Sequence, residues 1–182
     1  MNATRTTEPA DTDLRPGRPS APHQVLALAL LIVIPLSVGF LGSMATSDQV
    51  DGWYASADTA PWNPPNAVFG PVWSTLYVIM GFAAWLIWRR VDASSQRAAL
   101  TVFVVQLVLN SIWSPLFFGG YPIWRTAALW AAVVVILLLV GTLTETMRRF
   151  WRISALAGAL LIPYLAWVVY ATTLNVYIAL AN

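Results

Sequence analysis

Amides and aromatic rings recur at helical spacing in three apolar segments of the sequence. One segment holds Gln106, Asn110, Trp113 and Phe117, whose spacing of four, three and four places them on one helix face. Because polar amides are costly in hydrocarbon unless they face protein or a cavity, we expect this face to turn toward one of the two. Packing alone, with each amide bonded to a neighbouring helix, explains the same pattern.

Two further segments present aromatic faces of the same kind. They contain Phe69, Trp73, Tyr77 and Met80 in one segment and Tyr164, Trp167, Ala171, Leu174 and Ile178 in the other. Aromatic stripes at helical spacing more often serve packing than ligand binding. Three stripes in one small bundle nevertheless favour a flat apolar cavity between the helices.

Several classes of chemistry are excluded by the residues that the sequence lacks. There is no cysteine, and the single histidine, His23, lies in the polar N-terminal region. A thiolate zinc site, a cysteine nucleophile and a Ser-His-Asp triad are therefore not expected, and no metal site is predicted. No charged residue lies in the middle of an apolar segment, which argues against ion-coupled transport. The formal net charge of +2 is too small to indicate nucleic-acid binding.

The elements that must position these faces are transmembrane helices. Only 10% of the 182 residues are charged and 58% are hydrophobic, whereas soluble domains carry about 25% charged residues. A helix of about 20 residues crosses a membrane. Five runs reach that length, at 25–46, 67–88, 98–119, 125–146 and 153–179. The sequence predicts an all-α integral membrane protein with one five-helix domain at 25–182, preceded by a disordered polar tail at 1–24.

Arginines predict the orientation of the bundle. All ten basic residues are arginines, and nine lie in the tail, the second loop or the fourth loop. Five crossings place these three segments on one side, and only Arg125 lies on the other. Because basic residues concentrate in cytoplasmic loops, we expect the N-terminus inside and the first loop and C-terminus outside.

The first loop, Ser47 to Asn66, is long and contains no basic residue. Three prolines, Pro61, Pro64 and Pro65, restrict its backbone. Trp53, Tyr54 and Trp62 would be poor choices for a loop extended into water. Two interpretations have equal weight on this evidence: a folded lid that caps a pocket at the outer end of the bundle, and an aromatic belt at the membrane interface.

Three blocks of sequence resemble the TspO family of tryptophan-rich sensory proteins, which includes the mitochondrial translocator protein. They are WYASADTAPWNPPNAVFGPVWSTLYVIMG, which begins at Trp53, LNSIWSPLFFG at Leu109–Gly119, and PYLAWVVYATTLN at Pro163–Asn175. The blocks occur in the family's order and spacing. The resemblance extends over residues of about 25 to 180.

This resemblance implies a five-helix bundle whose folded first loop caps a pocket for porphyrins and other flat aromatic or lipid ligands. It implies no required cofactor, membrane lipids as partners, a homodimer formed through helices, and location in a bacterial cell membrane. By motif, the ligand-binding residues would be Tyr54, Pro64, Trp73, Tyr77, Asn110, Trp113, Trp167, Ala171 and Leu174. Trp73 and Trp167 would also be the catalytic, redox-active residues if the bound porphyrin is oxidised.

Three features depart from the family pattern. Ala67 stands where many members have an aromatic after the paired prolines, so the lid would close less tightly. Trp130 stands where relatives often carry an acid, and no basic residue follows Tyr177 to complete a cholesterol-binding motif. Three functions remain open: a receptor or sensor that binds or handles tetrapyrroles, a light- and oxygen-dependent enzyme that degrades porphyrin, and, less favoured, a porphyrin or lipid transporter. Enzyme activity is left open because no general acid or base is recognisable.

Overall fold

The computed structural model describes residues 20–90 and 93–182, and every regular element within them is helical. The elements in chain order are α1 (Ala21–Asp51), the 3-10 helix η1 (Trp53–Ser56), α2 (Asn66–Trp88), α3 (Ala93–Ser114), the π-helix η2 (Pro115–Gly119), α4 (Gly120–Trp124), α5 (Thr126–Ile153), α6 (Ala155–Leu160) and α7 (Ile162–Ala181).

Five helical stretches in the described residues are long and apolar enough to cross a membrane, which confirms the predicted fold class. They are α1, α2, the run from Ser94 to Trp124, α5 and the run from Ala155 to Ala181. The third run joins α3, η2 and α4, and the fifth joins α6 and α7. The chain is therefore an all-α integral membrane protein.

The first and fourth crossings are longer than predicted. α1 begins at Ala21 and continues to Asp51, so the first loop is shorter than the interval from Ser47 to Asn66. The rest of the predicted N-terminal tail, residues 1–19, lies outside the described residues. α5 continues to Ile153 through the interval predicted as the fourth loop. Ion pairs from Glu145 to Arg148 and Arg149, at 2.7 and 2.6 Å, satisfy these charges on a continuing helix.

The fifth crossing begins later than its predicted start at residue 153. Ile153 ends α5, and Ser154 leaves the helical conformation with φ −153° and ψ 112°. The Ser154 hydroxyl then accepts a hydrogen bond from the Ala157 amide at 3.4 Å, which caps α6. Leu161 separates α6 from α7, where Pro163 occupies the first turn without disrupting a hydrogen bond.

A local widening of the helix separates α3 from α4. Pro115 lacks an amide donor, and the chain forms the π-helix η2 from this residue to Gly119. α4 then ends at Trp124, and Arg125, with a positive φ of 52°, makes a one-residue turn into α5. The predicted third loop is therefore reduced to a single non-helical residue.

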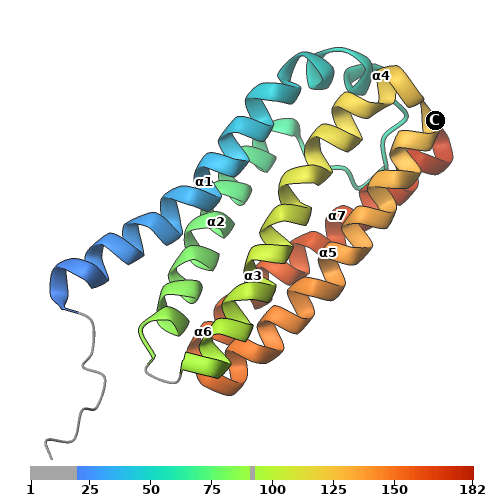
Figure 1. The fold of residues 1–182 in the computed structure, drawn as a ribbon. Helices are drawn as coiled ribbons and strands as arrows, with labels where there is room; N and C mark the ends of the chain where they lie inside the picture. The colour runs from blue at the N-terminus through green and yellow to red at the C-terminus, as the bar shows by residue number, and fades with distance from the viewer. Residues whose placement is uncertain (1–19, 91–92) are drawn as a thin grey trace, which may run out of the picture.

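The bundle has two distinct ends (Figure 1). The loop end holds residues 52–65, α4 and the C-terminal Asn182. The arginine end holds the beginning of α1, the end of α2 and the turn from α5 to α6. α5 lies between α3 and α7, whereas α1 packs mainly on α2 at the edge of the bundle.

Small residues bring the helices close together toward the arginine end. Ala83, Ala84 and Ala157 are completely buried there. A Cβ atom added at Gly81 would lie 2.3 Å from the Leu31 carbonyl oxygen, so glycine is required where α2 meets α1. Close approach through small residues is a common way for transmembrane helices to associate.

Candidate functional site

A cavity of about 700 Å³ lies within the half of the bundle nearest the loop end. α1, α2, α3 and α7 form its walls, and η1 and η2 contribute single turns. Small-molecule sites generally have volumes of about 300–1,000 Å³. The cavity is therefore large enough for a small organic ligand.

Small side chains on the facing helices leave this space open. A Cβ atom at Gly70 would have no neighbour within 4 Å, and one at Gly42 would only reach the Ser114 Cβ at 4.0 Å. Gly39 has a different role, because a Cβ there would lie 2.1 Å from the Tyr77 ring. Gly39 thus lets the Tyr77 ring lie directly against α1, at the wall of the cavity.

Two stacked ring pairs provide the aromatic surface of the cavity. Trp73 and Tyr77 on α2 have ring centroids 5.6 Å apart and planes inclined by 29°. Trp113 on α3 and Phe117 on η2 are 5.2 Å apart and inclined by 15°. All four residues line the cavity. Flat π systems bind such rings by offset stacking or edge contacts.

A chain of buried hydrogen bonds runs from the cavity wall into the centre of the bundle. The Tyr77 hydroxyl donates to Asn110 Oδ1 at 2.7 Å, and Asn110 Nδ2 donates to the Tyr164 hydroxyl at 3.0 Å. Tyr164 in turn donates to Gln106 Oε1 at 3.0 Å. Asn110 and Gln106 are thus both hydrogen bonded to other helices, as the packing interpretation predicts. Asn110 also lines the cavity, whereas Gln106 does not.

A second amide fixes the orientation of Trp113. The indole Nε1 donates to Asn175 Oδ1 at 3.0 Å, and Asn175 Nδ2 donates to the Leu129 carbonyl at 3.3 Å. These bonds link α3, α7 and α5. They hold the Trp113 ring in one plane, which favours selective stacking.

The described cavity lining contains no charged side chain, histidine, cysteine or methionine. Its polar groups are hydroxyls and amides, among them Ser43, Thr46 and Asn66. Tyr54 contributes a phenol from η1, and burial raises the pKa of its hydroxyl above the ordinary value. The lining can therefore offer stacking, apolar contact and neutral hydrogen bonds.

The structure brings seven of the nine predicted ligand-binding residues to the cavity. They are Tyr54, Trp73, Tyr77, Asn110, Trp113, Ala171 and Leu174. Pro64 and Trp167 are not part of the lining. Contact between the nine predicted residues and a ligand stays a prediction.

Trp167 lies behind the cavity wall. Its ring meets the lining residue Phe69 edge to face at 5.8 Å, and its Nε1 is buried without a hydrogen-bond partner. Trp167 is thus separated from the cavity lining by one ring contact, through Phe69. The redox role predicted for Trp73 and Trp167 stays a prediction.

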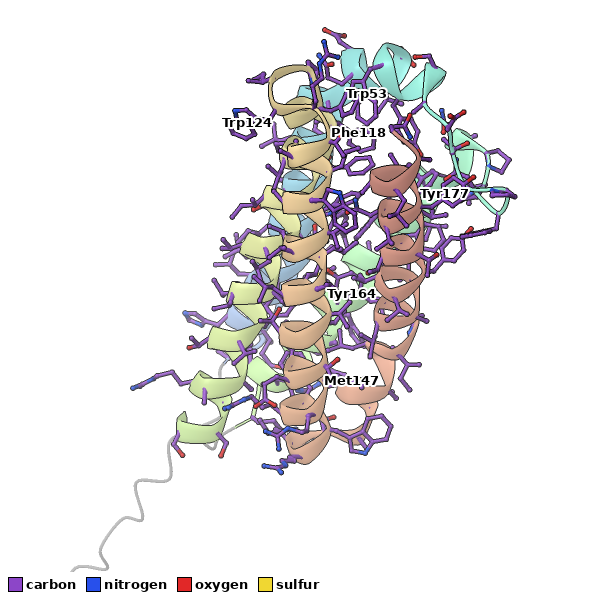
Figure 2. The ribbon with its side chains drawn as sticks, turned by 90° about the vertical axis from the view of Figure 1, so that its right-hand side faces the viewer. Trp53, Phe118, Trp124, Met147, Tyr164 and Tyr177 are labelled. Carbon is purple, nitrogen blue, oxygen red and sulfur yellow. The ribbon has the colours of Figure 1, made fainter. Side chains whose placement is uncertain are left out.

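The first loop is folded against the bundle. Trp53 Nε1 donates to the Phe118 carbonyl at 2.9 Å, and the Trp53 ring stacks on Tyr121 at 4.0 Å. Figure 2 shows Trp53 and Phe118 together at this end, whereas Trp124 points away from the bundle. The loop is thus anchored to η2 and α4.

The second half of the loop is held along α7. Trp62 Nε1 donates to Thr173 Oγ1 at 3.2 Å, and the Tyr170 hydroxyl donates to the Trp62 carbonyl at 2.6 Å. The Asp58 amide and carbonyl pair with the side chain of Asn182 at 3.1 and 3.2 Å. Of residues 53–65, only Tyr54 lines the cavity. The loop is therefore folded, and its action as a lid stays a prediction.

Sequence reasoning missed the contribution of α1. Gly39, Ser43, Thr46 and Val50 line the cavity along one side of this helix. Their separations of four, three and four residues are a helical pattern of small and polar side chains. That pattern is a usable signal, but it lies outside the aromatic stripes.

Comparisons with known proteins agree on one family. The model of the TspO/MBR family matches residues 31–181. The translocator protein of Bos taurus is 38% identical over 157 residues, which cover 85% of this chain and 89% of the relative. The tryptophan-rich protein TspO of Chlorobaculum tepidum is 37% identical over 164 residues, which cover 87% of this chain and 98% of the relative. The tryptophan-rich sensory protein of Cereibacter sphaeroides is 38% identical over 137 residues, which cover 74% of this chain and 81% of the relative.

Proposed function

The chain belongs to the TspO/MBR family, and on that premise we propose that it is a membrane receptor or sensor that binds porphyrins. The observation that carries this proposal is the cavity of about 700 Å³ with stacked aromatic pairs on two of its walls. The name of the Cereibacter sphaeroides relative, a tryptophan-rich sensory protein, supports a sensory role.

A porphyrin matches the cavity by its flat π system. The macrocycle would lie between the Trp73–Tyr77 and Trp113–Phe117 pairs, with each ring pair contributing about 0.5–1.5 kcal/mol beyond area burial. The propionates would face the loop end, where hydroxyls and amides can solvate them. Metal-free porphyrin is the preferred form, since the described lining offers no histidine, cysteine or methionine as an axial ligand. Other flat aromatic molecules and lipids would bind through the same apolar contacts.

A second candidate function is light- and oxygen-dependent degradation of the bound porphyrin. Excited porphyrin generates reactive oxygen species from molecular oxygen, and an indole near the macrocycle can relay or quench the oxidation. Trp73, on the cavity wall, favours this candidate. The protein would supply position and exclude water, while the photochemistry would belong to the ligand. Transport of porphyrin or lipid is the third and least favoured candidate.

The arginine distribution supports an N-terminus in the cytoplasm, with the first loop and the C-terminus outside. The proposed location is a bacterial cell membrane. A homodimer is proposed through α3. This helix exposes Val104, Val105 and Val108 on its outer side. Thr101 and Val105 would lie at this contact, which cross-linking of single cysteines along α3 in a bilayer would detect.

The test compares three tryptophans in porphyrin binding and in photo-oxidation. Trp73→Ala should weaken binding by at least about tenfold through lost ring contact, whereas Trp73→Phe should stay within a few fold because a ring still stacks. Under illumination in air, Trp73→Phe and Trp167→Phe should lose product formation selectively if indole oxidation is required. Spectral titration and absorbance of a ring-opened product measure the two effects.

Trp151 provides the control, because it lies near the arginine end and does not line the cavity. Trp151→Phe should leave both measurements unchanged. Equal responses from Trp73 and Trp151 would reject the proposed binding site. Loss of binding in Trp73→Phe without selective loss of turnover would reject the redox role.

A further inference from the structure

A second, shallower groove lies at the arginine end, between the beginning of α1 and the end of α2. Its volume is about 250 Å³, and it is lined by Ala21, Gln24, Val25, Leu28 and Trp85. It shares no residue with the larger cavity. In Figure 1 the first turns of α1 diverge from the end of α2 at this place. The groove is thus open on the edge of the bundle that faces the surrounding lipid.

Trp85 is held in a fixed position in this groove. Its Nε1 donates to the Gln24 carbonyl at 3.1 Å, which ties the α2 ring to the first turn of α1. Phe82 stacks on the same ring at 5.5 Å with planes inclined by 29°. The ring therefore forms a preorganised apolar wall beside Val25 and Leu28.

A guanidinium group lies over this wall. Arg89 Cζ is 4.7 Å from the centre of the Trp85 ring, a distance typical of a cation–π contact. The side chain remains exposed, and the structure pairs Arg89 with no carboxylate within residues 20–90 and 93–182. By contrast, Arg148 and Arg149 at the same end both bind Glu145. Among the described residues, Arg89 thus presents an exposed charge that lies over the Trp85 ring and has no carboxylate partner.

We propose that this groove binds an anionic phospholipid, with an acyl chain against Trp85 and Val25 and the phosphate on Arg89. The apolar wall and the cation at its rim match the two parts of such a lipid, and arginine pairs with phosphate through parallel hydrogen bonds. Basic sites between transmembrane helices on the cytoplasmic side bind anionic headgroups in this way. A soluble anion would use the guanidinium but leave the apolar wall in contact with bulk lipid.

The test uses phosphatidylglycerol and phosphatidylcholine that carry bromine on an acyl chain, each mixed into vesicles of unbrominated phosphatidylcholine with the full chain. Bromine quenches tryptophan on contact, and subtracting the signal of Trp85→Phe isolates Trp85. Brominated phosphatidylglycerol should quench Trp85 at a mole fraction at least about threefold lower than brominated phosphatidylcholine. Arg89→Gln should remove this preference, and Arg89→Lys should retain part of it, since a cation remains.

Arg152→Gln is the matched control, because Arg152 is exposed at the same end, whereas Arg89 is the arginine that lies over the Trp85 ring. It should keep the full preference, which distinguishes the groove from a general effect of positive charge. Equal quenching by the two lipids, a preference that persists in Arg89→Gln, or competition by inorganic phosphate as strong as that by unlabelled phosphatidylglycerol would overturn the proposal. Porphyrin binding, measured on the same samples, should be unchanged in Arg89→Gln.

Discussion

The same five crossings pack closely in the half of the bundle nearest the arginine end and enclose a cavity in the half nearest the loop end. Toward the arginine end, α2 approaches α1 so closely that the Leu31 carbonyl leaves no room for a side chain at Gly81. Toward the loop end, the same two helices border a cavity, and Gly42 and Gly70 face open space. Gly81 therefore permits a close helix contact, whereas Gly42 and Gly70 leave space in the cavity. The local neighbourhood, rather than the residue type, decides which.

A buried polar layer lies between the halves. Tyr77, Asn110, Tyr164 and Gln106 are hydrogen bonded in series across α2, α3 and α7. Tyr77 and Asn110 also line the cavity, whereas Tyr164 and Gln106 are fully buried. This polar layer therefore separates the half that contains the cavity from the closely packed half.

The largest expected effect comes from adding one methyl group to the packed half. Gly81→Ala should lower the free energy of unfolding by about 1–3 kcal/mol, because the new Cβ would have to displace the α1 backbone. Reversible unfolding in mixed detergent micelles measures this loss. Gly141→Ala is the control, since no heavy atom lies within 4 Å of the added Cβ. Equal stability of the two variants would show that the close approach of α1 and α2 is not a constraint.

A larger side chain in the hollow half should affect binding instead of stability. Gly42→Leu would project into the cavity and should weaken porphyrin binding by about tenfold or more, which is about 1.4 kcal/mol. The free energy of unfolding should change by less than about 0.5 kcal/mol. Fluorescence titration with porphyrin measures affinity, and Gly141→Leu is the matched control. Undiminished affinity in Gly42→Leu would place the ligand elsewhere.

The smallest effect is expected in the polar layer. Tyr164→Phe removes the hydroxyl between Asn110 and Gln106 and should cost about 0.6–1.7 kcal/mol, the range found for hydrogen bonds between transmembrane helices. The measurement is unfolding in mixed micelles. Tyr170→Phe, which removes the 2.6 Å bond to the loop, should cost less because the site is exposed. A larger loss in Tyr170→Phe would mean that the loop contributes more to stability than the polar layer.

Sequence patterns predicted the helices because membrane insertion depends on local properties. Length and apolarity identify a crossing without knowledge of its neighbours. Reliance on local properties also explains the error at the end of α5, where Arg148 and Arg149 indicated a loop. Their partner Glu145 lies one turn away, and only the helical conformation brings the three side chains together.

Residue type and periodicity also determined which faces of α2, α3 and α7 turn inward, and thus placed Trp73, Asn110 and Ala171 near one another. Tertiary structure alone decided that α1 completes the cavity, because the helical spacing of its small and polar residues does not say which helices they face. It also decided that Trp167 lies behind Phe69 and that residues 57–65 follow α7. These outcomes depend on contacts between segments distant in the chain, where packing volume and hydrogen-bond partners are set by the other helices.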